Sequence, residues 1–508
     1  MNTLRFLLGQ ELIELESVKP TLTVLNYLRE EKKRIGTKEG CAEGDCGACT
    51  VVIAEVVDDR LHYRAVNACI VFLATLDGKQ LLTVEDLKTA RNELHPVQQS
   101  MVDSHASQCG FCTPGFVMSG FAEYQNRLHR LDELPEPQSD EVVTTHLTQV
   151  FAGNLCRCTG YGPIIEAGKT WLAQAEQSMP RKLIQALNEE EANTIAQLKA
   201  IQPQTSKTLT QAGQTYIQPD SIPALTDALA KLPGATLLAG GTDIGLWVTK
   251  QHKTLDTVIY LGGIEALKRI EIRDGQLEIG AAVTYSEALP ALIRHFPRLE
   301  EYLYRHSSTQ IRNAGTVVGN IANGSPIGDM PPVLIALNAE ITLTRQGGQR
   351  HLPLEDYFIA YGKQDRQPTE FIECVRIPLL KSDAVLMNVY KISKRFEQDI
   401  SSVSAAFYIE LDEQQQVREA RLCFGGMAAT PKRATRCEQA LLNQPWNKAT
   451  VYAAAERLGD DFTPLSDFRA SREYRLAVAV NLLKKFFIQQ QSPTQATQIS
   501  YTGGLIHA

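Results

Sequence analysis

The sequence lacks any hydrophobic run long enough to cross a bilayer, and it lacks an excess of positive charge. A transmembrane helix needs about 20 consecutive apolar residues, and no stretch of the 508 residues approaches this. With 51 basic and 58 acidic residues the net charge is −7, so nothing favours nucleic acid or an anionic membrane as a partner. Acids directly follow a short apolar stretch at the N-terminus, which does not fit a secretory signal and favours a cytoplasmic protein.

Two common nucleotide-binding motifs are also missing. No G-x-G-x-x-G is present, so a dinucleotide would not bind through the Rossmann fingerprint. The expected strand "ATLLAG" runs into Gly240-Gly241-Thr242-Asp243 without the G-K-[ST] of a Walker A loop. Backbone N–H groups in such a turn can cradle phosphate, but a plain turn is the simpler interpretation of one Gly-Gly pair.

A second glycine-rich stretch covers residues 309–341, beginning "TQIRNAGTVVGNIANGSPIGD". It is too polar and too rich in glycine for a core strand. We predict a loop system, flanked by strands, that follows the backbone of a ligand.

Cysteine is abundant and unevenly placed. Eight of the eleven cysteines lie before residue 160. In a reducing compartment, clustered cysteines bind metal or perform redox chemistry more often than they form disulfides. The other three are scattered, and we interpret them as small buried apolar side chains: Cys374, Cys423 and Cys437.

The first cysteine set has C-x₄-C-x₂-C spacing and one further member downstream: Cys41, Cys46, Cys49 and Cys69. This is the plant-type spacing for a [2Fe–2S] cluster. Structural zinc is the alternative, although zinc sites usually use two close pairs of ligands. Glycines at 40, 44 and 47 allow positive φ and bring backbone N–H groups close to sulfur.

Local patterns place this set in a loop between a helix and a strand. Alternation on both sides of Gly9-Gln10 predicts a hairpin with a two-residue type II′ turn. Helical spacing of Val24, Leu25 and Leu28 predicts a helix capped by Thr21 or Thr23. A strand is expected again at 51–57.

The second cysteine set pairs C-x₂-C with C-x-C across 43 intervening residues: Cys109, Cys112, Cys156 and Cys158. C-x-C is a poor zinc motif, and the spacing alone indicates a metal cluster without specifying which. Helices are predicted at 114–128, with Pro114 near its start, and at 140–154, stopped by Gly153. Together they would bring the cysteines together, and "LPEPQSD" would form an exposed loop between them.

The motifs "GCAEGDCGACT", "SQCGFCTPGF" and "GNLCRCTGYGPI" together resemble the iron–sulfur region of the molybdenum hydroxylases, the group of xanthine dehydrogenases and aldehyde oxidases. The resemblance implies two [2Fe–2S] clusters, one held by each cysteine set. The first would lie in a β-grasp ferredoxin-like domain and the second in a four-helix-type domain. It also places Gln108 beside the molybdopterin of a partner, whereas on its own Gln108 would be taken for a loop hydrogen-bonder.

The two glycine-rich stretches resemble the flavin domain of the same family, which has the vanillyl-alcohol-oxidase-type fold. The resemblance implies that the first turn cradles the FAD pyrophosphate with Leu237, Leu238, Ala239, Gly240, Gly241, Thr242, Asp243 and Ile244. Further FAD-contacting positions are matched by His306, Thr316, Asn320, Asp329, Ile372 and Lys391. The chain departs from the family at Val318, where many members have glycine, and at His306, where some have an aromatic ring over the flavin.

The expected fold class is therefore a multidomain α+β chain. Its expected parts are a ferredoxin-like domain (1–84), a helical cluster domain (85–166), a linker (167–206), an FAD domain (207–382), a C-terminal α+β domain (383–490) and a tail (491–508). The C-terminal domain would end in a helix, "REYRLAVAVNLLKKFF", capped by Ser471 and favoured by Glu473 in its first turn.

Within the family, the resemblance is greatest to bacterial members that carry both clusters and the flavin on one smaller subunit. It implies a separate molybdopterin-binding large subunit in a two-plus-two heterotetramer, which hydroxylates xanthine or hypoxanthine to urate. Electrons would pass through the second set, the first set and FAD to NAD⁺, and no catalytic base for the hydroxylation would lie on this chain. Alternatives are a self-contained iron–sulfur flavoprotein NADH:acceptor reductase and a zinc-stabilised scaffold.

A cluster of charges at 394–400, "KRFEQDI", lies next to the matched flavin contact Lys391. We hypothesise that these charges help to set NAD⁺ access and the flavin potential.

Overall fold

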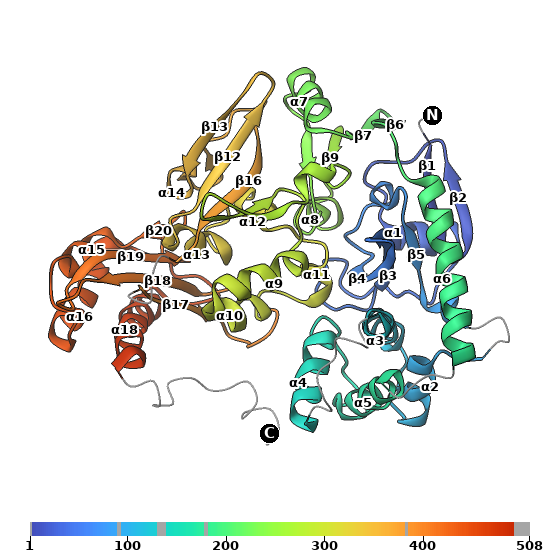
Figure 1. Cartoon of the computed structure of the whole chain (residues 1–508), viewed down its shortest axis with the longest axis horizontal. Helices are drawn as coiled ribbons and strands as arrows, with labels where there is room; N and C mark the ends of the chain where they lie inside the picture. Colours follow the sequence, from blue (N-terminus) through green and yellow to red (C-terminus); the bar gives the residue numbers. More distant parts are fainter. Residues whose placement is uncertain (1–2, 89–92, 130–138, 177–180, 381–384, 492–508) are drawn as a thin grey trace. The chain divides into compact units, whose positions relative to one another are not determined.

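The computed structural model describes residues 3–88, 93–129, 139–176, 181–380 and 385–491 (Figure 1). These residues group into two compact units. Unit 1 comprises 1–225, 234–264 and 308–315, and unit 2 comprises 226–233, 265–307 and 316–508. Each unit is described by itself.

Unit 1 combines two sheets with a group of helices. Its elements are β1 (Leu4–Leu8), β2 (Glu11–Leu15), α1 (Val24–Asn26), β3 (Thr50–Val57), β4 (Arg60–Asn67), β5 (Gln80–Leu82), α2 (Pro96–Asp103), α3 (Thr113–Leu128), α4 (Asp140–Phe151), α5 (Gly162–Glu176), α6 (Arg181–Ile201), β6 (Lys207–Gln211), β7 (Gln214–Gln218), β8 (Thr236–Leu238), α8 (Ile244–Thr249), β9 (Thr257–Tyr260) and α11 (Thr309–Arg312). Helix α7 (Ile222–Lys231) contributes to both units.

The first sheet has the strand order β2-β1-β5-β3-β4, in which β1 and β5 run parallel and the other neighbours antiparallel. The predicted hairpin is confirmed, because Leu8 pairs with Glu11 and Gly9 has φ +60°. The predicted helix is confirmed at its start, where Thr23 Oγ1 accepts from Asn26 N–H at 3.2 Å. After Asn26, however, the chain continues as one π-helical turn, Tyr27–Glu31.

Helices α2 to α5 pack against one another as a four-helix group (Figure 1). The helices predicted on either side of the second cysteine set are therefore confirmed, with Pro114 in the first turn of α3. Most of the predicted exposed loop "LPEPQSD" lies outside the described residues. The expected linker region contains the end of α5 and the long helix α6, which lies against β1, β3 and β4.

The second sheet of unit 1 has the order β6-β7-β9-β8, with β9 parallel to both β7 and β8. Strand β8 leads through Gly240 and Gly241 into α8, so the predicted strand and glycine-rich turn are both present. Leu238 and Tyr260 at the ends of β8 and β9 belong to one apolar core with the first sheet.

Unit 2 contains three sheets and several helices. Its elements are β10 (Ile270–Arg273), β11 (Gln276–Gly280), α9 (Tyr285–His295), α10 (Glu300–Tyr304), α12 (Val317–Ala322), α13 (Met330–Ala336), β12 (Glu340–Arg345), β13 (Gly348–Pro353), α14 (Leu354–Tyr357), β14 (Phe358–Ala360), β15 (Lys363–Gln364), β16 (Phe371–Pro378), β17 (Val385–Ile392), β18 (Val403–Leu411), β19 (Val417–Gly425), β20 (Lys432–Arg433), α15 (Thr435–Leu441), α16 (Lys448–Ala455), α17 (Leu458–Asp461) and α18 (Arg472–Gln491). The sheet orders are β10-β11-β16-β12-β13, β14-β15 and β17-β18-β19-β20.

The prediction of a loop system at 309–341 was wrong in detail. The stretch forms three short helices, α11, α12 and α13, and helices rather than a strand precede it. Ser308 Oγ accepts from Ile311 N–H at 3.3 Å and Thr316 Oγ1 from Gly319 N–H at 3.0 Å, and each contact starts a helical turn. Every residue of α13 is buried, so apolar packing rather than a ligand holds that helix.

The C-terminal part of unit 2 packs α15, α16 and α18 around one face of β17-β18-β19-β20. Ser471 Oγ accepts from Tyr474 N–H at 3.2 Å, which confirms the predicted cap of α18. Cys374, Cys423 and Cys437 are all buried, as expected. Among the described residues, no helix is both long and apolar enough to span a membrane.

Candidate redox centres

The loop that carries the first cysteine set is shaped by its glycines. Gly44 and Gly47 have φ of +80° and +67°, as predicted. Gly40 does not, and that part of the prediction was wrong. Small size is what Gly40 contributes, because a Cβ there would lie 2.8 Å from Cys46 Sγ. Backbone N–H groups do reach sulfur: Cys41 Sγ accepts from Glu43 and Cys46 at 3.4 and 3.3 Å.

The four thiols of the first set converge. Cys41 hydrogen-bonds to Cys46 and Cys69 through their sulfurs, and Cys49 to Cys69. These contacts lower the pKa of Cys41 and of Cys49 and raise the pKa of Cys69. Asn67 Nδ2 also donates to Cys49 Sγ at 3.9 Å.

The second set converges as well. The sulfurs of Cys109 and Cys158 are 3.2 Å apart, and Cys112 hydrogen-bonds to Cys156. Burial raises the pKa of Cys156, but hydrogen bonds with Thr159, Cys158 and Cys112 together outweigh burial and bring that pKa down to about 7. Cys109 and Cys158 are exposed, and so is the neighbouring Gln108.

Each set therefore brings four thiols together. Within the described part of the chain, no three His, Cys, Asp or Glu side chains surround a single point closely enough to hold one metal ion. A [2Fe–2S] cluster has two irons that share four cysteines, so its ligands need not surround one point. The donor sets fit such clusters better than the zinc alternative.

The two cysteine sets are joined by a short backbone contact. Leu155 N–H, which precedes Cys156, donates to the carbonyl oxygen of Cys46 at 3.0 Å. The approach is tight, because a Cβ at Gly47 would lie 2.0 Å from the Gly153 oxygen. Cys46 of the first set thus contacts Leu155, the residue next to Cys156 of the second set.

The glycine-rich turn lies against the first set within unit 1. A Cβ at Gly240 would lie 1.9 Å from the Ala314 oxygen, and Gly241 has φ +75°, so this turn requires glycine at both positions. In α8, a Cβ at Gly245 would lie 2.7 Å from Ile70, the residue after Cys69. The ammonium of Lys250, at the end of α8, donates to the Cys41 carbonyl.

In unit 2, three of the predicted FAD-contacting residues form one buried ionic group. The Asp329 carboxylate accepts from Lys391 Nζ at 2.7 Å and from Ser401 Oγ at 2.7 Å, and lies 3.0 Å from His306 Nδ1. Burial raises the pKa of Asp329, but Lys391 and His306 outweigh burial and hold it well below its usual range. The His306 ring packs on Tyr285, with centroids 4.3 Å apart.

The remaining predicted residues of unit 2 are a cap, an amide and a buried strand residue. Thr316 caps α12, and Ile372 is buried in β16. Asn320 Oδ1 is buried and has no hydrogen-bond partner within the described residues. An orphaned acceptor at this position fits a ligand that supplies a donor, as the resemblance implies for FAD.

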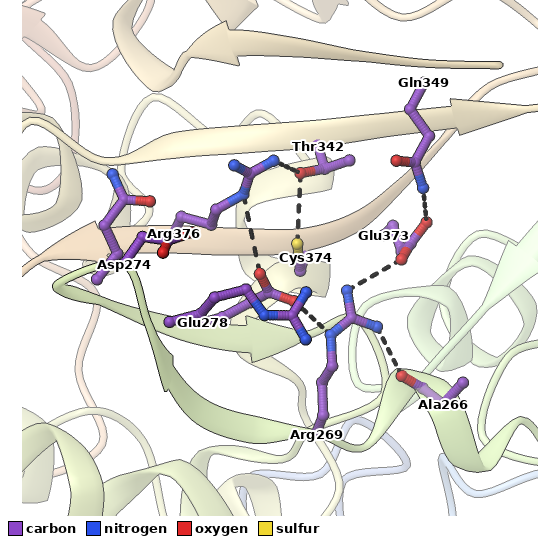
Figure 2. Close-up of a pocket in the computed structure, with 11 residues that line it drawn as sticks. Ala266, Arg269, Asp274, Glu278, Thr342, Gln349, Glu373, Cys374 and Arg376 are labelled. Atoms are coloured by element: carbon purple, nitrogen blue, oxygen red, sulfur yellow. Dashed lines mark hydrogen bonds and ion pairs between the residues drawn. The ribbon is translucent and has the colours of Figure 1, made fainter.

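Sequence reasoning missed a polar pocket of about 460 Å³ on one face of the first sheet of unit 2 (Figure 2). A β-bulge opposite Thr342 and Leu343 interrupts the register of β16 and turns Glu373 and Cys374 toward this face. The signal available in the sequence was the pair of charged residues, Glu373 and Arg376, inside the otherwise apolar "FIECVRIP".

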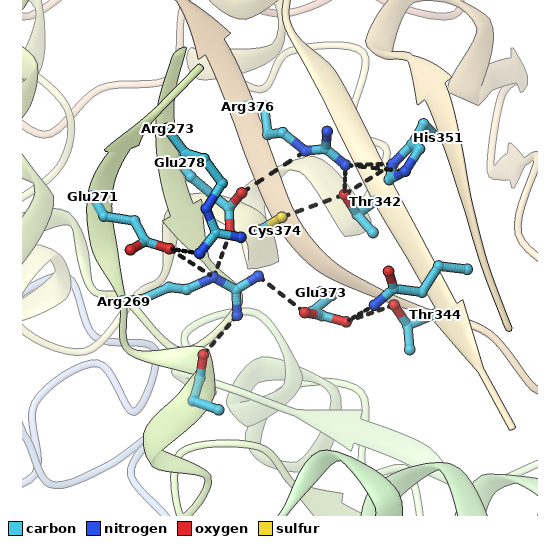
Figure 3. A network of polar contacts seen from close by, with 12 residues as sticks. Arg269, Glu271, Arg273, Glu278, Thr342, Thr344, His351, Glu373, Cys374 and Arg376 are labelled. Carbon is cyan, nitrogen blue, oxygen red and sulfur yellow. Dashed lines mark hydrogen bonds and ion pairs between the residues drawn. The ribbon is translucent and has the colours of Figure 1, made fainter. Parts of the chain in front are cut away.

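Several charged groups of this pocket pair with one another (Figure 3). Arg269 bridges the buried carboxylates of Glu278 and Glu373, the latter at 2.9 Å. Glu373 also accepts from Thr344 Oγ1 at 2.7 Å and Gln349 Nε2 at 2.8 Å. Because Glu278 lies on β11, Glu373 on β16 and Thr344 on β12, we assign this network to holding the three strands together.

The chain matches four domain families in sequence order. They are described as 2Fe-2S iron–sulfur cluster binding domain (7–74), [2Fe-2S] binding domain (83–169), FAD binding domain in molybdopterin dehydrogenase (208–380) and CO dehydrogenase flavoprotein C-terminal domain (388–490). Two [2Fe–2S] domains and an FAD domain in one polypeptide define an iron–sulfur flavoprotein, an oxidoreductase.

Similar proteins narrow the class. The chain is 29% identical to a xanthine dehydrogenase of Emericella nidulans over 97% of its own length and 39% of that protein's, and 30% identical to one of Calliphora vicina over 95% and 38%. Among solved structures, reconstituted CO dehydrogenase from Oligotropha carboxidovorans is 26% identical with a TM-score of 0.51, covering 55% of this chain and 96% of that one. The four domains in one chain match the molybdenum hydroxylase family, and the chain spans about two fifths of the length of these curated relatives.

Proposed function

We propose that the chain is the electron-transfer subunit of an NAD⁺-dependent xanthine dehydrogenase that acts in the cytoplasm. Electrons from xanthine or hypoxanthine oxidation at a partner's molybdopterin site would pass through the second set, the first set and FAD to NAD⁺. The similarity to xanthine dehydrogenases along nearly the whole chain supports this substrate. A flavin accepts electrons singly and delivers them as hydride, which suits the step to NAD⁺.

The observation that carries the proposal is the continuity of contacts inside unit 1. The second set contacts the first through Leu155 N–H and the Cys46 carbonyl. The first set contacts the glycine-rich turn and α8 through Ile70 and Lys250. The second cysteine set, the first cysteine set and the glycine-rich turn are thus linked in series, which is the arrangement that a one-electron relay needs.

The surface around the second set suits a docked partner. Cys109 and Cys158 are exposed, and beside them Phe111 is 47% and Tyr161 39% exposed. Exposed aromatic side chains next to a redox centre mark an interaction surface. We therefore propose that a molybdopterin-binding large subunit covers this surface, with Gln108 at the molybdopterin, in a two-plus-two heterotetramer.

We propose that FAD is held by the residues that the resemblance implies. Leu237–Ile244 would bind the pyrophosphate through backbone N–H groups. Thr316, Asn320, Asp329, Ile372 and Lys391 would contact the rest of the nucleotide, and His306 would stack on the flavin. The Asp329 carboxylate keeps the Lys391 ammonium paired and oriented.

The charged loop 394–400 would control NAD⁺ access. Arg395 is largely exposed, whereas Asp399 is mostly buried and accepts from the Arg395 backbone N–H at 2.9 Å. The two therefore differ in role: Arg395 would meet the cofactor, and Asp399 would hold the loop. Arg395→Gln should raise KM for NAD⁺ at unchanged flavin content. NAD⁺ kinetics unchanged from those of the unaltered protein in both Arg395→Gln and Asp399→Asn would contradict the hypothesis.

The proposed function is tested by electron paramagnetic resonance on the dithionite-reduced, purified protein. Two distinct [2Fe–2S] signals of equal spin are expected. Cys156→Ser should remove one signal and Cys46→Ser the other, while Cys437→Ala, at a buried cysteine outside both sets, should keep both. Zinc in place of iron would support the scaffold alternative. Two clusters with NADH:acceptor activity but no co-purifying molybdopterin subunit would support the reductase alternative.

A further inference from the structure

Gln310 lies at the centre of a buried hydrogen-bond network within unit 1. Its side chain is fully buried, and its Nε2 donates to Ser119 Oγ and to Asn154 Oδ1, both at 3.0 Å. Ser119 is on α3, which begins directly after Cys112, and Asn154 lies two residues before Cys156. Gln310 therefore contacts one residue on each arm of the second set.

Asn154 extends the network to the first set. Its Nδ2 donates to the Gly47 oxygen and to Thr50 Oγ1, both at 3.1 Å, and Ser119 Oγ donates to its Oδ1 at 2.6 Å. The next residue is Leu155, whose N–H donates to the Cys46 carbonyl. The orientation of the Asn154 amide thus fixes both sides of the contact between the two sets.

The packing leaves Gln310 no freedom. A Cβ at Gly153 would lie 1.7 Å from Gln310 Oε1, and a Cβ at Gly115 would lie 2.3 Å from the Gly47 oxygen. Gln310 Oε1 is buried and has no hydrogen-bond partner in the described part of the chain. An unpaired buried acceptor is unfavourable for folding. Local rules are broken in this way at functional positions.

We propose that Gln310 is a positioning residue for electron transfer between the two cysteine sets. The inference rests on the proposed function. With a [2Fe–2S] cluster held by each set, one electron would pass from the reduced cluster of the second set to the oxidised cluster of the first set. Gln310 orients Asn154 and thereby holds the hydrogen bond from Leu155 to Cys46 at its observed length.

A neighbour of Gln310 supplies a matched control. The segment 308–315 makes further hydrogen bonds to the rest of unit 1. Thr309 Oγ1 donates to the Gln149 oxygen at 2.8 Å, and Asn313 Nδ2 donates to the Ala65 oxygen at 2.9 Å. Thr309→Val removes this bond to Gln149 and the bond that Thr309 Oγ1 accepts from Arg312 at 3.0 Å, and it leaves the network of Gln310 in place.

The test compares Gln310→Met with Thr309→Val in the purified complex. Methionine keeps the length and volume of the side chain but removes the donor. At low temperature, Gln310→Met should keep both cluster signals at equal spin while the splitting that arises from their magnetic interaction shrinks or is lost. After reduction from the substrate side, the first-set cluster should be reduced more slowly. Thr309→Val should keep the splitting and the rate at comparable thermal stability.

The inference fails if Gln310→Met retains the splitting and the rate of the unaltered protein, or if Thr309→Val loses them equally. If Gln310→Met does not assemble its clusters, Ser119→Ala removes the other donor to Asn154 Oδ1 and should show the same loss. An unchanged splitting in Ser119→Ala would then overturn the inference. Failure of the proposed function looks different, since the unaltered protein itself would lack two signals.

Discussion

Gly47 tests the contact between the two cysteine sets most directly. Its left-handed φ of +67° would cost a residue with a Cβ about 1–2 kcal/mol. In Gly47→Ala the new Cβ would also lie 2.0 Å from the Gly153 oxygen and 2.7 Å from Asn154 Nδ2. Relieving such overpacking typically costs about 1–3 kcal/mol. The total expected destabilisation is therefore about 2–5 kcal/mol.

Gly160→Ala separates the two contributions. Gly160 has φ +68°, but nothing lies within 4 Å of its added Cβ, so only the backbone cost applies. Heating both variants while following the visible absorbance of the clusters should show Gly47→Ala melting roughly 2–12 °C below Gly160→Ala. It should also show an altered splitting between the cluster signals. Equal melting temperatures together with an unaltered splitting would refute the close approach of the two sets.

Three further predictions concern buried polar groups. Asp329→Asn should cost about 3–5 kcal/mol at neutral pH and lower the FAD content, because Lys391 loses its buried counter-ion. In the unaltered protein the low pKa of Asp329 means that this contribution to stability is complete above the unfolded carboxyl pKa of about 3.9 and is lost only as pH falls through the lower folded value. Equal melting curves of Asp329→Asn and the unaltered protein at pH 7 would contradict this prediction. Burial lowers the pKa of His95 to about 4 in the folded protein. Because His95 in the unfolded chain has a pKa of about 6.5 and binds its proton first, stability should fall by up to about 3 kcal/mol as pH decreases from 6.5 to 4. His95→Asn keeps an acceptor for the cap of α2 and should flatten that part of the curve of melting temperature against pH. Glu373→Gln should destabilise unit 2 by about 1–3 kcal/mol in denaturant unfolding, whereas Glu271→Gln, which breaks a more exposed ion pair with Arg273, should change it by less than about 1 kcal/mol.

Features fixed by short-range patterns could be predicted from the sequence. The Gly9-Gln10 hairpin and the cap at Ser471 each depend on residues within one turn. The grouping of the eight cysteines followed from their spacing and from the resemblance to the family. In the stretch 309–341, glycine and polar residues suggested a loop, although the hydroxyl caps at Ser308 and Thr316 were readable signals for helices.

Features made by distant residues could not be predicted. Gln310 hydrogen-bonds to residues 156 and 191 positions away, and no local pattern distinguishes it from a surface glutamine. The bulge that turns Glu373 into the pocket depends on how β12 pairs with β16, and the burial of Lys391 depends on Asp329, 62 residues earlier. Such contacts form only when the chain closes long loops, which sequence periodicity does not describe.

The long separation of Gln310 from Asn154 has a consequence for synthesis of the protein. The ribosome adds roughly 5–20 residues per second, and 156 residues separate the two partners. Cys158, the last of the eight clustered cysteines, therefore leaves the ribosome roughly 8–30 s before the glutamine that completes their surroundings, and the other seven leave earlier. During that interval the thiols of both cysteine sets lack their final packing. Iron delivery to the two sets therefore has to wait for residue 310 or act on an incomplete fold.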